Sequence, residues 1–134
     1  MFFLGIDIGK NSHVASLTDD KKKVIFKAFS FSNSIDGAEC LICKLEPFKN
    51  QLEIGMEATG HYWINLFSFL LQKNFSVHLI NPIQTDGWRN STENLDFTTI
   101  TTATVHTVHI GRTLNILQQR FFHTGNIFIN AEWR

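Results

Sequence analysis

Residues 2–10 constrain the fold of this chain more than any other stretch. They are apolar or glycine except for Asp7 and the closing Lys10, and such a run predicts a strand at the centre of a sheet covered on both faces. A buried carboxylate without a partner costs several kcal/mol, so we expect a cation or a metal ion beside Asp7. Gly5 and Gly9 leave one face of the strand open to close approach by backbone or phosphate. The alternative is that Asp7 caps a turn at the strand end.

Composition describes one globular domain, since 43% of the 134 residues are hydrophobic and 18% are charged. The net charge of zero gives no general attraction to nucleic acid. All lysines lie at or before Lys73 and only arginines follow, which suggests two stretches of different origin or role. No apolar run approaches the roughly 18 residues of a membrane span, and residues 2–4 are too short for a signal peptide. We therefore expect a cytoplasmic protein with no membrane partner.

The order of predicted elements indicates the fold class. Residues 2–10, 13–18 and 24–29 read as three strands joined by short polar turns, which predicts an antiparallel meander. A helix capped by Asn33 or Ser34 should run to about Leu45, where Pro47 closes it. A strand at residues 51–57, a helix at 61–73 and a strand at 75–80 then form a crossover that requires parallel pairing. We expect an α/β fold with a ribonuclease H-like mixed sheet and flanking helices.

Two details of these helices also yield predictions. Trp63, Leu66, Phe67, Leu70 and Leu71 form an apolar stripe on the second helix and are expected in the core. Cys40 and Cys43 form a C-x-x-C motif, which can mean redox chemistry or half of a zinc site. No second cysteine pair exists, and the motif lies in an apolar-periodic helix, so we expect buried or half-buried thiols.

Asp7 and Glu57 each end a predicted strand beside glycines. If the two strands are neighbours, about 4.8 Å apart, the two carboxylates share one end of the sheet. Carboxylates that close repel each other unless a cation joins them, and oxygen ligands select Mg²⁺ or Mn²⁺. Phosphodiester chemistry uses pairs of such ions, which need more than two acidic ligands, so further ligands should lie later in the chain.

Three segments carry a resemblance to a known family. They are Gly5-Ile6-Asp7-Ile8-Gly9-Lys10, Gly55-Met56-Glu57-Ala58-Thr59-Gly60-His61-Tyr62-Trp63 and Ile80-Asn81-Pro82-Ile83-Gln84-Thr85-Asp86-Gly87-Trp88-Arg89. In these segments the chain resembles the insertion-sequence 110 transposases, whose amino-terminal domain is similar to the resolvase RuvC and carries a DEDD tetrad. The resemblance implies that Asp7 and Glu57 are the first two members of that tetrad, that they hold Mg²⁺ or Mn²⁺, and that both are catalytic. It also implies DNA and a structured guide RNA as partners, with Lys10, Trp88 and Arg89 near nucleic acid.

The chain departs from this family at Asn94. The family places its last two acids as D-x-x-D on a helix, whereas here Asp96 stands alone with Thr99 three positions on. The threonine-rich residues 98–105 have low helix propensity, because most of them are β-branched. We hypothesise that the reading frame changes near residue 94, because reading the codons of this stretch in a neighbouring frame permits D-x-x-D. A gene sequence in which no neighbouring frame encodes that motif would exclude the frame change. Residues 1–93 would then be an incomplete RuvC-like domain, and residues 94–134 a divergent tail.

The expected function is therefore that of the amino-terminal part of a transposase, which binds DNA and a divalent metal ion but is catalytically incomplete. It lacks the second acidic pair, and it lacks the serine of the family's carboxy-terminal domain. One alternative is a non-catalytic remnant or a partner that interferes with a full-length transposase. The expected protein partners are a full-length transposase or a second copy of this chain. Another is a sugar-kinase or actin-like phosphate-binding domain, which also opens with a D-x-G strand. The H-x-x-H of His106 and His109 has no third ligand nearby and is not expected to bind metal.

Overall fold

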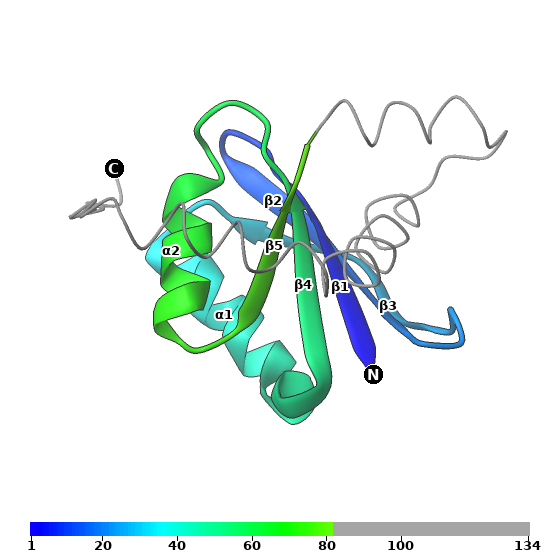
Figure 1. The fold of residues 1–134 in the computed structure, drawn as a ribbon. Coiled ribbons are helices and arrows are strands. Elements are labelled where there is room, and N and C mark those ends of the chain that lie inside the picture. Colours follow the sequence, from blue (N-terminus) through cyan, green and yellow to red (C-terminus); the bar gives the residue numbers. More distant parts are fainter. Residues whose placement is uncertain (82–134) are drawn as a thin grey trace, which may run out of the picture.

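The computed structural model describes residues 1–81 of the chain (Figure 1). In chain order the elements are β1 (Phe2–Asp7), β2 (Ser12–Asp19), β3 (Val24–Ser32), α1 (Ile35–Leu45), η1 (Glu46–Gln51), β4 (Leu52–Glu57), α2 (Ile64–Gln72) and β5 (Ser76–Ile80). Every strand and both α-helices expected from the sequence within this range are present. Neither α-helix of residues 1–81 is long and apolar enough to span a membrane.

The five strands form one mixed sheet in the order β3-β2-β1-β4-β5. β1, β2 and β3 pair antiparallel, while β4 pairs parallel with β1 on one side and with β5 on the other. The hairpin turns are short, whereas each parallel pair is joined through a helix, as parallel pairing requires. The predicted α/β mixed sheet, a three-strand meander plus parallel crossover strands, is confirmed.

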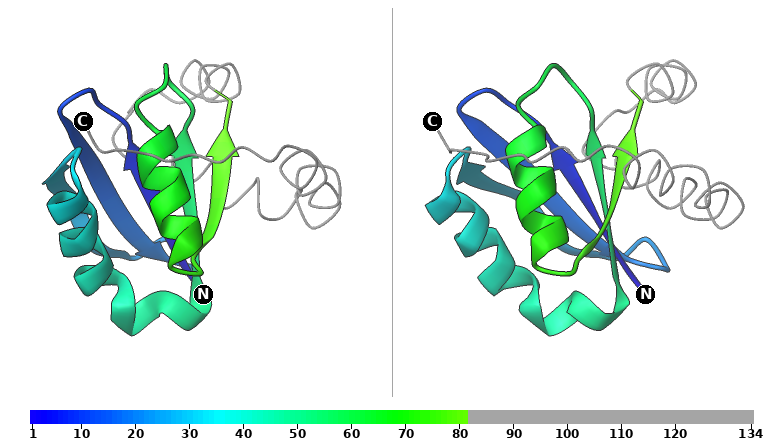
Figure 2. Two further views of the ribbon diagram at one scale, coloured as in Figure 1. Left: turned by 90° about the vertical axis from the view of Figure 1, so that its left-hand side faces the viewer. Right: turned by 60° about the vertical axis from the view of Figure 1, so that its left-hand side comes forward.

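Both α-helices cover the same face of the sheet, as the two views of Figure 2 show. Alternate strand residues point toward them, including Leu4 and Ile6 of β1 and Ile54 and Met56 of β4, all fully buried. The helices contribute the residues that complete this core: Ala38, Leu41 and Leu45 of α1, and Leu66, Phe67, Phe69 and Leu70 of α2. Each fully buried aliphatic side chain stabilises the fold by about 1.5–3 kcal/mol.

The opposite face of the sheet carries glycines and polar residues, together with the buried apolar side chains of Phe3 and Ile80. Because side chains alternate along a strand, Gly5 and Asp7 of β1 point this way, together with Glu53, Gly55 and Glu57 of β4. No helix of residues 1–81 packs on this face. The sheet therefore has its main apolar core on the helix side, while the carboxylates and glycines of β1 and β4 lie on the other side, here called the polar face.

Helix α1 begins as predicted, with Ser34 rather than Asn33 as its N-cap. The Gly37 N–H donates to Ser34 Oγ at 3.2 Å, which satisfies one of the free amides of the first turn. Pro47 ends the α-helix, and the chain continues as the short 3₁₀ helix η1. A proline is tolerated at the start of such a turn because the first amides have no helical acceptor.

The prediction of buried thiols in α1 was wrong, because Cys40 and Cys43 are both exposed. The residues that face the sheet are Ala38, Leu41 and Leu45, spaced three and four apart. The cysteines lie between these positions in the sequence and therefore on the outer side of the helix.

The apolar stripe predicted for α2 was wrong at one position. Leu70 is fully buried, whereas Leu71 is 45% exposed and Phe69 is buried in its place. One residue corresponds to about 100° of helical rotation, which carries Leu71 past the edge of the buried face. The helix also starts at Ile64 rather than His61, because residues 58–63 form a loop in which Gly60 has a φ of +59°.

Leu70 and Leu71 provide a matched pair for testing this packing. We expect Leu70→Ala to lower the free energy of unfolding by about 2–5 kcal/mol, because it leaves a cavity in the core. Leu71→Ala makes the same chemical change at the next position, and should cost less than about 1 kcal/mol. Urea denaturation followed by circular dichroism measures both, and equal losses would contradict the observed orientation of α2.

Candidate functional site

Asp7 and Glu57 lie at the ends of two neighbouring parallel strands. The register pairs Gly5 with Gly55 and Ile6 with Met56, so the next step along each strand places Asp7 beside Glu57. Both side chains point to the polar face of the sheet, because each lies two residues beyond a paired glycine. The structure thus brings together the two carboxylates that the sequence predicted at one sheet end.

The two carboxylates differ in their surroundings. The Asp7 side chain is exposed, whereas Glu57 is only 7% exposed. The backbone around Glu57 is also held, since the Ala58 N–H donates to the Ile80 carbonyl at 3.1 Å and the Thr59 N–H donates to the Glu57 carbonyl at 2.9 Å. Glu57 is therefore the fixed member of the pair, and Asp7 is the member open to solvent.

Lys10 lies in the turn that follows β1, at the same end of the sheet. Asn33 holds this turn with two hydrogen bonds, from its side-chain N–H to the Lys10 carbonyl at 3.0 Å and from its backbone N–H to the Asn11 carbonyl at 2.9 Å. A Cβ atom at Gly9 would collide with the Ser12 carbonyl oxygen, so this tight turn requires glycine. The Lys10 side chain is exposed and extends from a rigid turn near Asp7.

His13 supports the same turn from inside the core. Its Nδ1 accepts a hydrogen bond from the Gly9 N–H at 3.3 Å, its ring packs against Phe31 with centroids 5.3 Å apart, and only 1% of it is exposed. The acceptor role of Nδ1 assigns the proton of the neutral ring to Nε2. No role was predicted for His13 from the sequence, although its place on the inward side of strand β2 was a usable signal.

Burial lowers the pKa of His13 below 6.5. Asn33 and the negative charge of Asp7 act in the opposite direction. However, His13 Nε2 and Asn33 Oδ1 are buried without a hydrogen-bond partner of good geometry. Desolvation of the charged ring is therefore the larger effect, and the pKa of His13 is lowered. His13 is neutral at pH 7 in the folded protein.

The loop between β4 and α2, residues 58–63, lies at the end of the sheet that carries the β1–β2 turn (Figure 1), and it contains three aromatic residues, His61, Tyr62 and Trp63. The rings of His61 and Tyr62 lie with centroids 4.5 Å apart, and His61 is exposed. Trp63 Nε1 donates to the Gly60 carbonyl at 3.0 Å and anchors the loop. These residues belong to the motif quoted in the sequence analysis, but their proximity to the β1–β2 turn follows only from the sheet topology.

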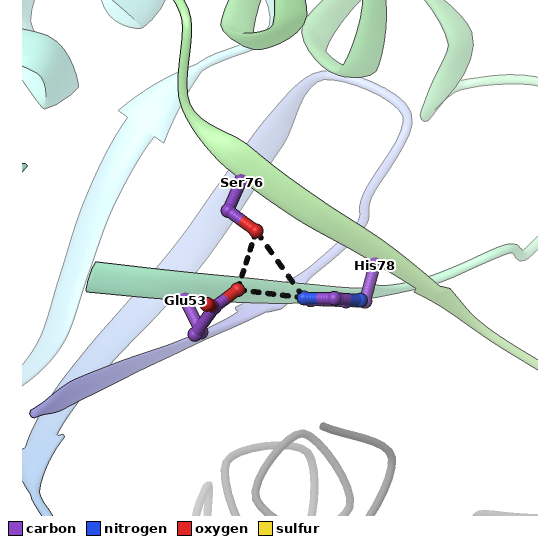
Figure 3. A network of polar contacts seen from close by, with 3 residues as sticks. All are labelled: Glu53, Ser76 and His78. Carbon is purple, nitrogen blue, oxygen red and sulfur yellow. Dashed lines mark hydrogen bonds and ion pairs between the residues drawn. The ribbon is translucent and has the colours of Figure 1, made fainter. Parts of the chain in front are cut away.

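A second polar cluster lies at the other end of β4, as Figure 3 shows. His78 Nε2 lies 2.7 Å from Glu53 Oε2, and Ser76 Oγ donates to the same oxygen at 2.5 Å. A hydrolytic triad requires the serine and the carboxylate to contact different nitrogens of the histidine, whereas here both approach Nε2. The cluster therefore ties the edge strand β5 to β4 and is not an arrangement for nucleophilic catalysis.

Trp88 and Arg89, predicted near nucleic acid, lie outside the described residues, as do His106 and His109. Within residues 1–81, no group of three or more histidine, cysteine or acidic side chains could hold a metal ion.

Comparisons with known proteins place this geometry in context. The family model of the insertion-sequence 110 DEDD transposases, described as Transposase, matches residues 4–96. Comparison with curated proteins gave no match.

Several solved structures show distant similarity. Pelota from Archaeoglobus fulgidus is 13% identical with a TM-score of 0.48, over 91% of this chain and 37% of that protein. An Aquifex aeolicus member of the Ppx/GppA family is 16% identical with a TM-score of 0.35, over 63% of this chain and 36% of that protein. The type II variant of the Aquifex aeolicus Ppx/GppA phosphatase is 18% identical with a TM-score of 0.36, over 61% of this chain and 36% of that protein. This chain spans little more than a third of each, and these similarities carry no functional argument.

The buried neutral His13 makes stability depend on pH in a defined direction. The unfolded state takes up a proton near pH 6.5 and the folded state only at lower pH, so the stabilising contribution is complete above pH 6.5 and is lost as the pH falls through the lowered pKa. We expect the free energy of unfolding to fall by up to about 1.4 kcal/mol per pH unit below pH 6.5 from this residue.

Urea denaturation at several pH values measures that slope. His13→Gln should remove it, while His61→Gln, at an exposed position, should leave it unchanged. An identical slope in wild type and His13→Gln would show that another group is responsible.

Proposed function

This chain belongs to the insertion-sequence 110 family of DEDD transposases, as its motifs indicated. We propose that it binds a divalent metal ion through Asp7 and Glu57 and that it also binds DNA. The family match, from residue 4 to residue 96 of 134, supports a role in transposition. It does not favour the sugar-kinase or actin-like alternative.

The single observation that carries the metal-site proposal is the adjacency of the two carboxylates. Asp7 and Glu57 extend to the same face of the sheet from neighbouring strands whose backbones lie about 4.8 Å apart, and two carboxylates in such positions repel each other. A hard divalent cation removes this repulsion, and Mg²⁺ is commonly held by one or two carboxylates with water and substrate phosphates completing its shell. The donor set therefore fits Mg²⁺ or Mn²⁺, in line with the general metal dependence of the family.

A bound divalent ion would supply electrostatic stabilisation of a phosphodiester oxygen. The protein's own contribution is positional. Glu57 is buried and its flanking backbone is held by β5, so its carboxylate is preorganised. Asp7 is exposed, so it can meet an ion that arrives with its water shell or with DNA.

Nucleic-acid contact is proposed for Lys10 and, outside the described residues, for Trp88 and Arg89. Lys10 is held on a turn fixed by Asn33 and His13, close to the end of β1. The exposed ammonium of a lysine whose backbone is held beside an acidic metal site can bind the phosphate flanking the one at the metal, which adds affinity and orients the DNA backbone.

The chain supplies only part of the family's acidic tetrad. No D-x-x-D follows Arg89 in the sequence, so we infer that this chain alone does not complete transposition. A structured guide RNA and a full-length transposase remain proposed partners. The alternative of a non-catalytic remnant, or of a partner that interferes with an intact transposase, is retained without an observation that favours it.

Mn²⁺ binding, measured by electron paramagnetic resonance of the free ion, tests the metal site. We expect Asp7→Asn and Glu57→Gln each to weaken binding by at least about tenfold, because each removes one charged ligand of the same size. Asp20→Asn and Glu39→Gln are matched controls at exposed positions outside the site, and should bind as wild type. Equal affinities in all five proteins would eliminate the proposed site.

DNA binding at several salt concentrations tests the role of Lys10. Loss of one phosphate contact should weaken binding to every sequence alike and reduce the slope of log K against log salt by about one in Lys10→Gln. Lys21→Gln, on the β2–β3 hairpin at the far end of the sheet, should keep the wild-type slope. A larger effect at Lys21 than at Lys10 would move the DNA contact to the hairpin.

A further inference from the structure

The two cysteines of the chain form a pair of exposed thiols on one side of a regular helix. Cys40 and Cys43 are free, both are exposed, and they lie one turn apart within α1. Free cysteine is among the most buried residue types, so two adjacent exposed thiols are not explained by packing. The outer side of α1 that carries them points away from the sheet (Figure 2).

The helix limits what this pair can do. Residues three apart on a helix have Cβ atoms roughly 5–6 Å apart, whereas a disulfide requires about 3.5–4.5 Å. Closing a disulfide inside one chain would therefore deform α1, which is continuous from Ile35 to Leu45. A metal ion can bridge the pair without such deformation, since two thiolates about 2.3 Å from a tetrahedral zinc ion keep their sulfurs about 3.8 Å apart, against about 2.05 Å in a disulfide.

The pair is nevertheless only half of a structural zinc site. Such sites use four ligands in a tetrahedron, often from C-x-x-C pairs. No third histidine, cysteine or acidic side chain joins the pair within residues 1–81. A second copy of the chain, related by a twofold axis, offers an identical C-x-x-C pair.

We propose that Cys40 and Cys43 are half of a four-thiolate zinc site that is completed by the same pair of a second copy of this chain. In an antiparallel pair of α1 helices centred between these residues, Cys40 of one copy faces Cys43 of the other. Glu39 then faces Lys44 of the other copy, so the nearest charged positions are opposite in sign. Binding one Zn²⁺ forms four Zn–S bonds and releases four protons from the four thiols, and needs no oxidant or reductant.

The proposal does not depend on the DNA-binding function. α1 covers the apolar face of the sheet, and the carboxylates of Asp7 and Glu57 point to the opposite face. A dimer joined through α1 would leave the sheet face that carries Asp7 and Glu57 uncovered by the second copy. Dimerisation through the outer side of α1 is thus compatible with metal and DNA binding at the carboxylates, and it can be tested in the absence of DNA and Mg²⁺.

Zinc titration of the full chain, with its thiols kept reduced by a phosphine, tests the site. Analytical ultracentrifugation should show conversion to a dimer that is complete at one zinc ion per two chains. Cobalt in place of zinc should give the thiolate charge-transfer and intense visible bands of a tetrahedral sulfur site. Cys40→Ser and Cys43→Ser should each lose the zinc-induced dimer and the sulfur bands while keeping the helical circular dichroism of wild type.

A variant with His106→Ala and His109→Ala separates this site from the only H-x-x-H of the sequence, and should dimerise with zinc as wild type does. Zinc-induced dimers in both serine variants would overturn the proposal. So would binding of one zinc ion per chain without a change in mass, or a cobalt complex without sulfur bands.

Discussion

The parallel register between β1 and β4 is the constraint on which the rest of this structure depends. It places Gly5 opposite Gly55 and buries Leu4, Ile6, Ile54 and Met56 beneath the helices. A slip of either strand by one residue would turn its apolar side chains to the polar face and carry its carboxylate toward the core. The hydrophobic burial that stabilises the sheet therefore also fixes Asp7 and Glu57 side by side on the open face.

Polar contacts on both sides of this pair hold the sheet end in place. On the β1 side, buried His13 and Asn33 fix the turn that carries Lys10, and His13 remains neutral because burial disfavours its charge. On the β4 side, Glu53 and His78 tie the edge strand β5, whose terminal carbonyl holds the backbone beyond Glu57. The acidic site is thus supported by preorganised groups that never contact a ligand themselves.

The two faces of the sheet also separate two kinds of chemistry. Hard oxygen ligands lie on the polar face, and the soft thiols of Cys40 and Cys43 lie on the outer side of α1, beyond the core. Ions of the Mg²⁺ type and ions of the Zn²⁺ type would therefore bind at different places for reasons of ligand chemistry. A transposase-family chain built in this way can associate through one side while its acidic side remains accessible.

The sequence by itself determined the order and type of the elements within residues 1–81, because hydrophobic periodicity and turn residues are local signals. Connection lengths then predicted which strands pair parallel, but that β1 and β4 are neighbours, and so that Asp7 and Glu57 share one sheet end, was decided by the strand order of the folded sheet. The exposure of Cys40, Cys43 and Leu71, and the contact between Glu53 and His78, were decided only by the tertiary structure. Which side of a helix is covered, and which residues meet across two strands, depend on packing between segments far apart in sequence, and no local pattern specifies that packing.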